Sequence, residues 1–127
     1  MRSELIQRLR FSRDFETLRL EGFRFDMGHF VVNARLRLPT ESPQGYLGMR
    51  FGVIATKRLG NAPERNRAKR RSRELVHMHA QLSAYPVDIV LVLRRSVLKA
   101  PWDQLVEKFS RASRLVEKAI LKEKSSA

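Results

Sequence analysis

Residues 56–73 read TKRLGNAPERNRAKRRSR, and this stretch decides the fold. Asn61 is a favourable helix N-cap, and Glu64, three residues later, completes a capping-box pattern. The pattern predicts a helix that runs to about His79 or Leu82, directly after a hydrophobic segment of strand character. The predicted helix therefore lies between two predicted strands, Leu47–Thr56 and Val87–Leu93.

The predicted helix is strongly basic. The segment Lys57–Arg73 holds eight Lys or Arg and one acid, and Arg outnumbers Lys six to two. At about 100° per residue, the small residues Ala68 and Ser72 lie on a packing side, and most cations lie on the other. Such charge runs are often only solvated, but the single sign and the arginine preference favour phosphate binding. The outward set is Arg65, Asn66, Lys69, Arg70, Arg73 and His77.

The composition indicates one domain with a polyanionic partner. The chain has 127 residues, 43% of them hydrophobic, and a formal net charge of +13. Cysteine is absent, which excludes disulfides and CxxC zinc sites and fits a cytoplasmic location. The longest aliphatic run, Ile89–Leu93, is too short to span a bilayer, and no secretory leader is expected. We expect a domain over residues 1–121 and a frayed tail over residues 122–127.

The other hydrophobic patterns predict two more helices and four strands in the order α-β-β-β-α-β-α, a small α+β domain. Alternation over His29–Leu38 predicts a strand with one apolar and one polar, basic face. The continuous aliphatic run Val87–Leu93 predicts a central strand covered on both faces. The remaining elements are a helix from Ser12 to Gly22, a short strand at Phe23 and Phe25, a strand Leu47–Thr56 after a loop at 39–45, and a helix from Pro101 with Trp102 and Phe109 in its buried stripe.

The segment Lys57–Ala62 followed by Arg65–Arg70 closely resembles the "RNR" signature of the bacterial ribonuclease P protein subunit. The likeness continues in Asp14-Phe15 with Gly22, in the strand Val87–Arg94 and in the terminal amphipathic helix. The resemblance implies an α-β-β-β-α-β-α sandwich with a four-stranded sheet and a left-handed β-α-β crossover. Most crossovers of this kind are right-handed, so general sequence physics predicts the opposite hand.

The resemblance also implies a function. The protein would be the cofactor of ribonuclease P, with no catalytic residue and no metal site of its own. It would bind ribonuclease P RNA, which holds the active site and its Mg²⁺, and the 5′ leader of precursor tRNA. By position, the contacts to the catalytic RNA would come from Lys57, Arg58, Asn61, Arg65, Asn66, Arg67, Lys69, Arg70, Arg73 and Arg94. The leader contacts would come from Phe15, Arg19, Asn33 and Arg35, where Arg19 and Asn33 replace the aromatic residues of many relatives.

Other functions are less well supported by the residues. The acids show no paired spacing, and His77 and His79 lie about 200° apart on a helix, so an independent nuclease or metal site is disfavoured. DNA binding lacks a helix-turn-helix pattern, and a membrane-surface helix lacks bulky apolar anchors. A ribosomal or ribosome-assembly protein is the nearest alternative. It would bind rRNA tightly and leave tRNA maturation unchanged.

Overall fold

The computed structural model describes residues 7–9, 12–41 and 48–126. The predicted strand start at 47 and most of the predicted 39–45 loop lie outside these residues. The helices are α1 (Ser12–Glu21), α2 (Ala62–Met78) and α3 (Trp102–Ser126), with short 3-10 turns η1 (Pro39–Glu41), η3 (Ala80–Ala84) and η4 (Arg95–Leu98). The strands are β1 (Gln7–Arg8), β2 (Phe23–Asp26), β3 (Phe30–Leu36), β4 (Arg50–Ile54) and β5 (Val87–Leu93).

The strands form one mixed sheet in the order β1-β4-β5-β3-β2. β1, β4 and β5 are parallel, and β3 is antiparallel to both β5 and β2. The predicted α+β class and element order are confirmed. The sheet has one strand more than predicted, because β1 is only two residues long and carries no readable alternation.

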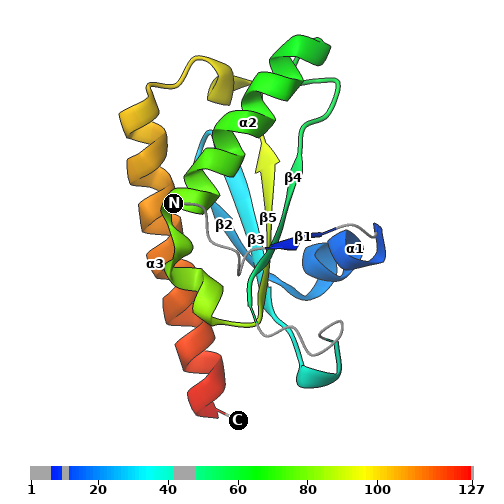
Figure 1. Cartoon of the computed structure of the whole chain (residues 1–127), viewed down its shortest axis with the longest axis vertical. Helices are drawn as coiled ribbons and strands as arrows, with labels where there is room; N and C mark the ends of the chain where they lie inside the picture. Colours follow the sequence, from blue (N-terminus) through cyan, green and yellow to red (C-terminus); the bar gives the residue numbers. More distant parts are fainter. Residues whose placement is uncertain (1–6, 10–11, 42–47, 127) are drawn as a thin grey trace.

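β4, α2 and β5 form a parallel crossover within this sheet. In Figure 1, α2 lies in front of the sheet, and β4 and β5 both run upward. The chain leaves β4, passes down through α2 and enters β5, which lies to the left of β4. The crossover is therefore left-handed, as the resemblance implies and against the general rule.

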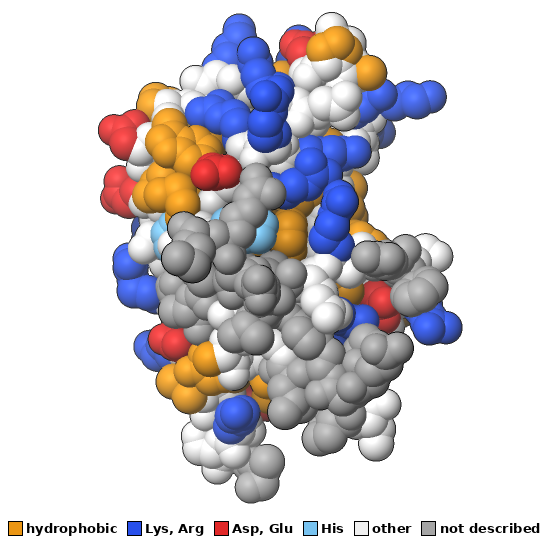
Figure 2. Space-filling model, in the orientation of Figure 1, with side chains coloured by type: hydrophobic (Ala, Val, Ile, Leu, Met, Phe, Trp, Pro, Cys, Tyr) orange, Lys and Arg blue, Asp and Glu red, His pale blue; other side chains and the backbone are white. Residues whose placement is uncertain are grey.

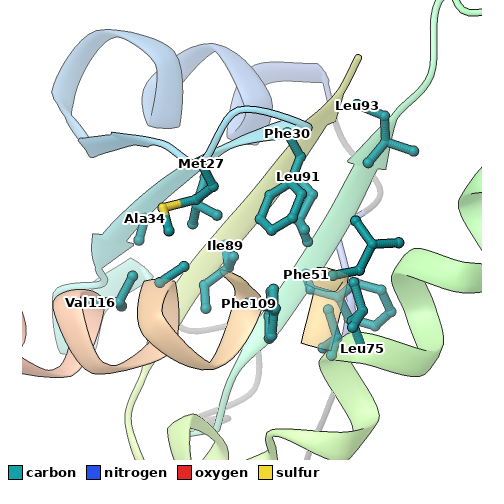
Figure 3. Close-up of a cluster of buried hydrophobic side chains, with 14 of the residues drawn as sticks. Met27, Phe30, Ala34, Phe51, Leu75, Ile89, Leu91, Leu93, Phe109 and Val116 are labelled. Atoms are coloured by element: carbon teal, nitrogen blue, oxygen red, sulfur yellow. The ribbon is translucent and has the colours of Figure 1, made fainter. Parts of the chain in front are cut away.

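Helices cover both faces of the sheet (Figure 1). α1 packs on one face through Leu18, against Val90 of β5, whereas α2 and α3 cover the other face. β5 is buried along almost its whole length, which confirms the predicted central strand. Figure 3 shows the main core between the sheet and the two long helices, where the labelled side chains include Phe30, Ala34, Phe51, Leu75, Ile89, Leu91, Phe109 and Val116.

Gly22 follows α1 where the helix meets β3. Its N–H donates to the carbonyl of Leu18 at 3.0 Å, as expected for the residue that ends this helix. A Cβ on Gly22 would lie 2.6 Å from the Leu18 oxygen and 2.9 Å from the Ala34 oxygen. Only glycine allows the chain to turn at this distance from β3.

Several predictions of detail were wrong. Trp102 is 36% exposed and lies at the edge of the buried stripe of α3, while Phe109 is buried as predicted. Leu38 is 59% exposed because β3 ends at Leu36. α3 continues to Ser126, so the helix extends into the predicted tail, and the predicted domain boundary at residue 121 stays a prediction. Fraying of the last residues stays a prediction.

A buried ionic cluster joins β4, β5 and the end of β3. Asp88 of β5 accepts hydrogen bonds from Arg37 at 2.6 Å and from Arg50 at 2.8 and 2.6 Å. Arg37 also donates to the carbonyl of Gly48 at 2.7 Å. All three charged side chains are nearly inaccessible to solvent, so Arg37 and Arg50 are structural cations.

Candidate nucleic-acid interface

α2 begins with the capping box that the sequence predicts. Asn61 Oδ1 accepts a hydrogen bond from the Glu64 backbone N–H at 2.9 Å, and Glu64 Oε1 accepts one from the Asn61 backbone N–H at 2.9 Å. The helix ends at Met78, close to the predicted end. His79 is the C-cap, and its Nδ1 lies 2.8 Å from the carbonyl oxygen of Leu75. Both ends of the basic helix are thus fixed.

The small side of α2 packs against the sheet, as predicted from Ala68 and Ser72, both of which are buried. His77 is half-buried with its ring edge-on to Phe51, so it is not part of an open basic face. The Lys and Arg residues of α2 take part in none of the ion pairs found in the described ranges of the chain. Figure 2 shows Lys and Arg side chains gathered over the upper part of the molecule, where α2 begins. This charge is held in place without protein counter-ions.

The predicted RNA-binding residues are divided between two levels of exposure. The exposed ones are Lys57, Arg58, Asn61, Asn66, Arg67 and Arg70. Arg65, Lys69 and Arg73 are half-buried, and Arg65 donates to the carbonyl of Gly60 at 2.9 Å. The structure brings these residues together on one helix and on the turn before it. Their contact with RNA stays a prediction.

A cleft of about 110 Å³, here named the inner cleft, lies between α2 and the sheet. Burial, together with repulsion from Arg8, lowers the pKa of Arg73 below its ordinary value. The positive charges of Arg8 and Arg73 therefore repel each other at this site. The inner cleft is lined by Arg8, Leu9, Phe15, Phe51, Gly52, Val53, Lys69 and Arg73, which include three cations and no acid.

The Phe15 ring of α1 lies in the inner cleft next to Gly52 of β4. The ring fits there because glycine has no side chain. A Cβ on Gly52 would lie 2.7 Å from the Phe15 ring. The group closest to Gly52 is thus an aromatic side chain from another element. Arg8 was not predicted from the sequence. β1 is only two residues long, so no periodic pattern distinguishes Arg8 from other charged residues.

The other three predicted leader contacts do not line the inner cleft. Arg19 is 67% exposed and pairs with Glu16 at 2.6 Å. Asn33 is half-buried in β3. Arg35 pairs with Glu41 at 2.8 Å and approaches Glu21 at 3.7 Å. Of the predicted leader set, only Phe15 lies in the cleft, and the role of the other three stays a prediction.

Arg94 follows β5 and is paired with an acid. Its guanidinium donates to both carboxylate oxygens of Asp26 at 2.8 Å and to the carbonyl of Gly28 at 3.0 Å. The hydrogen bonds from Arg94 and from the Gly28 N–H lower the pKa of Asp26 to about 2. The charge of Arg94 is therefore largely neutralised within the protein, and its predicted contact with RNA stays untested.

Arg71 of α2 serves the fold. It donates to the carbonyls of Val97 at 3.0 Å and Ala100 at 2.9 Å. Its guanidinium also lies over the ring of Trp102, 5.6 Å from the centroid. These contacts fasten α2 to the turn before α3 and explain why Trp102 lies at the surface.

Two features absent from the described residues bear on other functions. In the ranges 7–9, 12–41 and 48–126, no three His, Cys, Asp or Glu residues are placed to hold a metal ion together. Within the same ranges, no helix combines the length and apolar character needed to cross a membrane.

An α+β domain that presents arginines without protein counter-ions beside a basic, aromatic cleft has the features expected of a polyanion-binding protein. The sequence model of the family Ribonuclease P matches residues 5–118. The Ribonuclease P protein component of Brucella suis is 38% identical over 109 residues, covering 84% of this chain and 77% of that one. The corresponding protein of Kocuria rhizophila is 33% identical over 105 residues, covering 83% and 87%.

A solved structure is also similar. The RNase P protein of Thermotoga maritima has a TM-score of 0.68 and 26% identity, with coverage of 84% of this chain and 94% of that one. The chain therefore belongs to the ribonuclease P protein family, the protein components of a ribonucleoprotein that acts in tRNA processing.

Proposed function

We propose that this protein is the non-catalytic subunit of cytoplasmic ribonuclease P. It binds ribonuclease P RNA through the exposed cations of α2. It holds the 5′ leader of precursor tRNA in the inner cleft, where Lys69 and Arg73 face the leader instead of the catalytic RNA predicted for them. The RNA subunit then removes the leader in a Mg²⁺-dependent endonucleolytic step, which leaves the mature 5′ end of the tRNA. The observation that carries this proposal is a rigid row of cations without protein counter-ions, beside a cleft that holds an aromatic ring.

The inner cleft suits a single strand of RNA. Arg8, Lys69 and Arg73 can neutralise successive phosphates, and Phe15 offers a ring on which any base can stack. Stacking of this kind is worth about 1–3 kcal/mol per base and does not depend strongly on sequence. A subunit that must accept the leaders of many precursor tRNAs needs this type of recognition.

The protein's part in the reaction is electrostatic. In this proposal, Mg²⁺ bound by the RNA supplies the metal chemistry. The cations of α2 reduce the repulsion between the catalytic RNA and its polyanionic substrate. We therefore expect the holoenzyme to require less Mg²⁺ than the RNA alone.

The first experiment is cleavage of precursor tRNA by a bacterial ribonuclease P RNA at low Mg²⁺, with and without the protein. Rescue that requires the RNA supports the proposal. No rescue, together with tight binding to rRNA, refutes it and favours a ribosomal role.

Salt dependence provides a second test of the same function. Neutralisation of four to six phosphates would give a slope of about −3 to −5 in log affinity against log salt. A slope near zero would contradict the electrostatic account. Arg67→Ala should weaken binding to the RNA more than Lys118→Ala, because Lys118 is an exposed cation of α3 outside the motif.

A further inference from the structure

Asp14 of α1 points towards the sheet, although it does not line the inner cleft. At about 100° per residue, Asp14, Leu18 and Phe15 fall within one arc of roughly 100° around the helix, and Leu18 lies between the other two. Leu18 is buried against Leu9 and Val90, whereas Asp14 and Phe15 are half-buried. α1 therefore rests on the sheet through an apolar side chain, with an acid on one side of it and the aromatic ring on the other.

Asp14 contacts a cation of the buried ionic cluster. Its Oδ2 lies 3.7 Å from Nη1 of Arg50, and the two side chains are 21% and 10% exposed. Arg37 and Arg50 share the carboxylate of Asp88, so these three groups together carry an excess of positive charge. Asp14 supplies a second negative charge to this cluster, and the attraction draws the first turn of α1 towards β4.

The acid and the ring of α1 meet one face of β4. Side chains two residues apart on a strand point to the same face, so the Arg50 side chain and the missing side chain of Gly52 lie on the same side of β4. Asp14 is paired with Arg50, and the Phe15 ring fills the space over Gly52, where a Cβ would lie 2.7 Å from it. These two contacts align α1 with neighbouring positions of one strand.

α1 depends on such contacts for its orientation. A helix of ten residues is marginal in water by itself, so tertiary contacts must hold it in place. Leu18 is the buried residue of α1, and a single apolar contact leaves the helix free to roll. Since Asp14 and Phe15 lie on opposite sides of Leu18, a roll that separates Asp14 from Arg50 also moves the ring over Gly52.

We propose that Asp14 is a positioning residue for the leader: its attraction to Arg50 fixes the roll of α1 and so holds the Phe15 ring where a leader base stacks. This inference rests on the proposed function. It predicts an effect opposite in sign to that of charge alone. Removal of an acid close to a basic cleft should strengthen the binding of a polyanion, whereas loss of positioning should weaken the contact with the leader.

The test measures how strongly the holoenzyme, assembled from the full chain and a bacterial ribonuclease P RNA, prefers precursor tRNA over mature tRNA. Asp14→Asn keeps the size of the side chain and should lower this preference about two- to fivefold, as expected for a partly exposed ion pair. Asp14→Glu keeps the charge and should retain most of the preference. The matched control is Glu16→Gln, which removes the same charge from a 56% exposed acid of the same helix and should not lower it.

A double-mutant cycle with Phe15 distinguishes positioning from a general effect on the fold. Phe15→Ala should lower the preference about fivefold or more, and the addition of Asp14→Asn should cause no further loss, because the acid acts through the ring. Affinity for the catalytic RNA without precursor tRNA should not change in any of these variants. Arg50 keeps Asp88 in Asp14→Asn, so this variant should stay folded, which far-ultraviolet circular dichroism checks.

Two results would overturn the inference and leave the proposed function intact. One is a preference that Asp14→Asn leaves unchanged or raises, since the ion pair would then not position the ring. The other is a double variant that shows the full product of the two single losses, since Asp14 would then act independently of Phe15. A wild-type holoenzyme without any preference for precursor tRNA would instead refute the proposed role of the inner cleft, and the inference with it.

Discussion

Replacement of Asp88 by Asn should destabilise the domain more than any other single change to a polar residue discussed above. Asp88 is 4% exposed and lies between Arg37 and Arg50, which are 3% and 8% exposed. It accepts three charge-assisted hydrogen bonds of 2.6–2.8 Å from these two guanidinium groups. An amide at this position keeps one acceptor oxygen and loses the charge, so two buried cations are left without their carboxylate.

The size of the effect follows from that geometry. Removal of one partner from a buried ion pair costs about 3–5 kcal/mol, most of it from the uncompensated charge that remains. Arg50 keeps a distant acid, Asp14 at 3.7 Å, and Arg37 keeps the carbonyl of Gly48. We therefore expect the lower end of the range, about 3 kcal/mol, which corresponds to a fall in Tm of roughly 10–20 °C for a domain of this length.

Urea unfolding followed by far-ultraviolet circular dichroism measures this loss directly. The matched control is Glu107→Gln, because Glu107 is an exposed acid of α3 that loses the same charge. The control should stay within about 0.5 kcal/mol of the wild type. If Asp88→Asn unfolds within about 1 kcal/mol of the control, the ionic cluster does not stabilise the sheet, and the reasoning is refuted.

Three further outcomes are expected. Gly52→Ala should displace the Phe15 ring, because the new Cβ would lie 2.7 Å from it. The variant should therefore lose about fivefold or more of its preference for precursor tRNAs with long leaders over those with short leaders. Its affinity for the catalytic RNA should not change. The Asp26 carboxylate, whose pKa is lowered to about 2 by Arg94, contributes stability above pH 4 that is lost as the pH falls towards 2. Asp26→Asn should therefore flatten the acid dependence of the urea midpoint, and an unchanged profile would contradict the pairing. Asn61→Ala should cost about 1 kcal/mol in the same unfolding assay, and no loss would mean that the cap does not matter.

Features that depend on interactions between residues close together in the chain are predicted well from the sequence. The capping box of Asn61 and Glu64 connects residues three apart, so its pattern is visible in the chain and is confirmed. The packing side of α2 follows from the helical period in the same way. The carbonyl partners of Arg71 lie 26 and 29 residues further along the chain, and a helical wheel cannot tell whether a flanking arginine reaches solvent or these carbonyls.

Long-range pairing also limits the prediction of the site. Arg8 enters the inner cleft only because the two-residue strand β1 pairs with β4, and two residues carry no periodicity. Arg35 has the residue type expected of a leader contact. However, η1 places Glu41 beside it, and the Glu41 carboxylate pairs with the Arg35 guanidinium. The left-handed crossover came from the resemblance to a family, since general rules for β-α-β units favour the other hand.

The burial of Ala68 and Ser72 has a consequence for evolution as well as for packing. These two side chains are the spacers between α2 and the sheet, and Ser72 Oγ donates to the Ala68 carbonyl at 2.9 Å within the helix. Any enlargement would lift the helix and widen the inner cleft while every cation that lines it remained in the sequence. Evolution can therefore change the width of this cleft by as little as one methyl group, through two buried residues that do not line it.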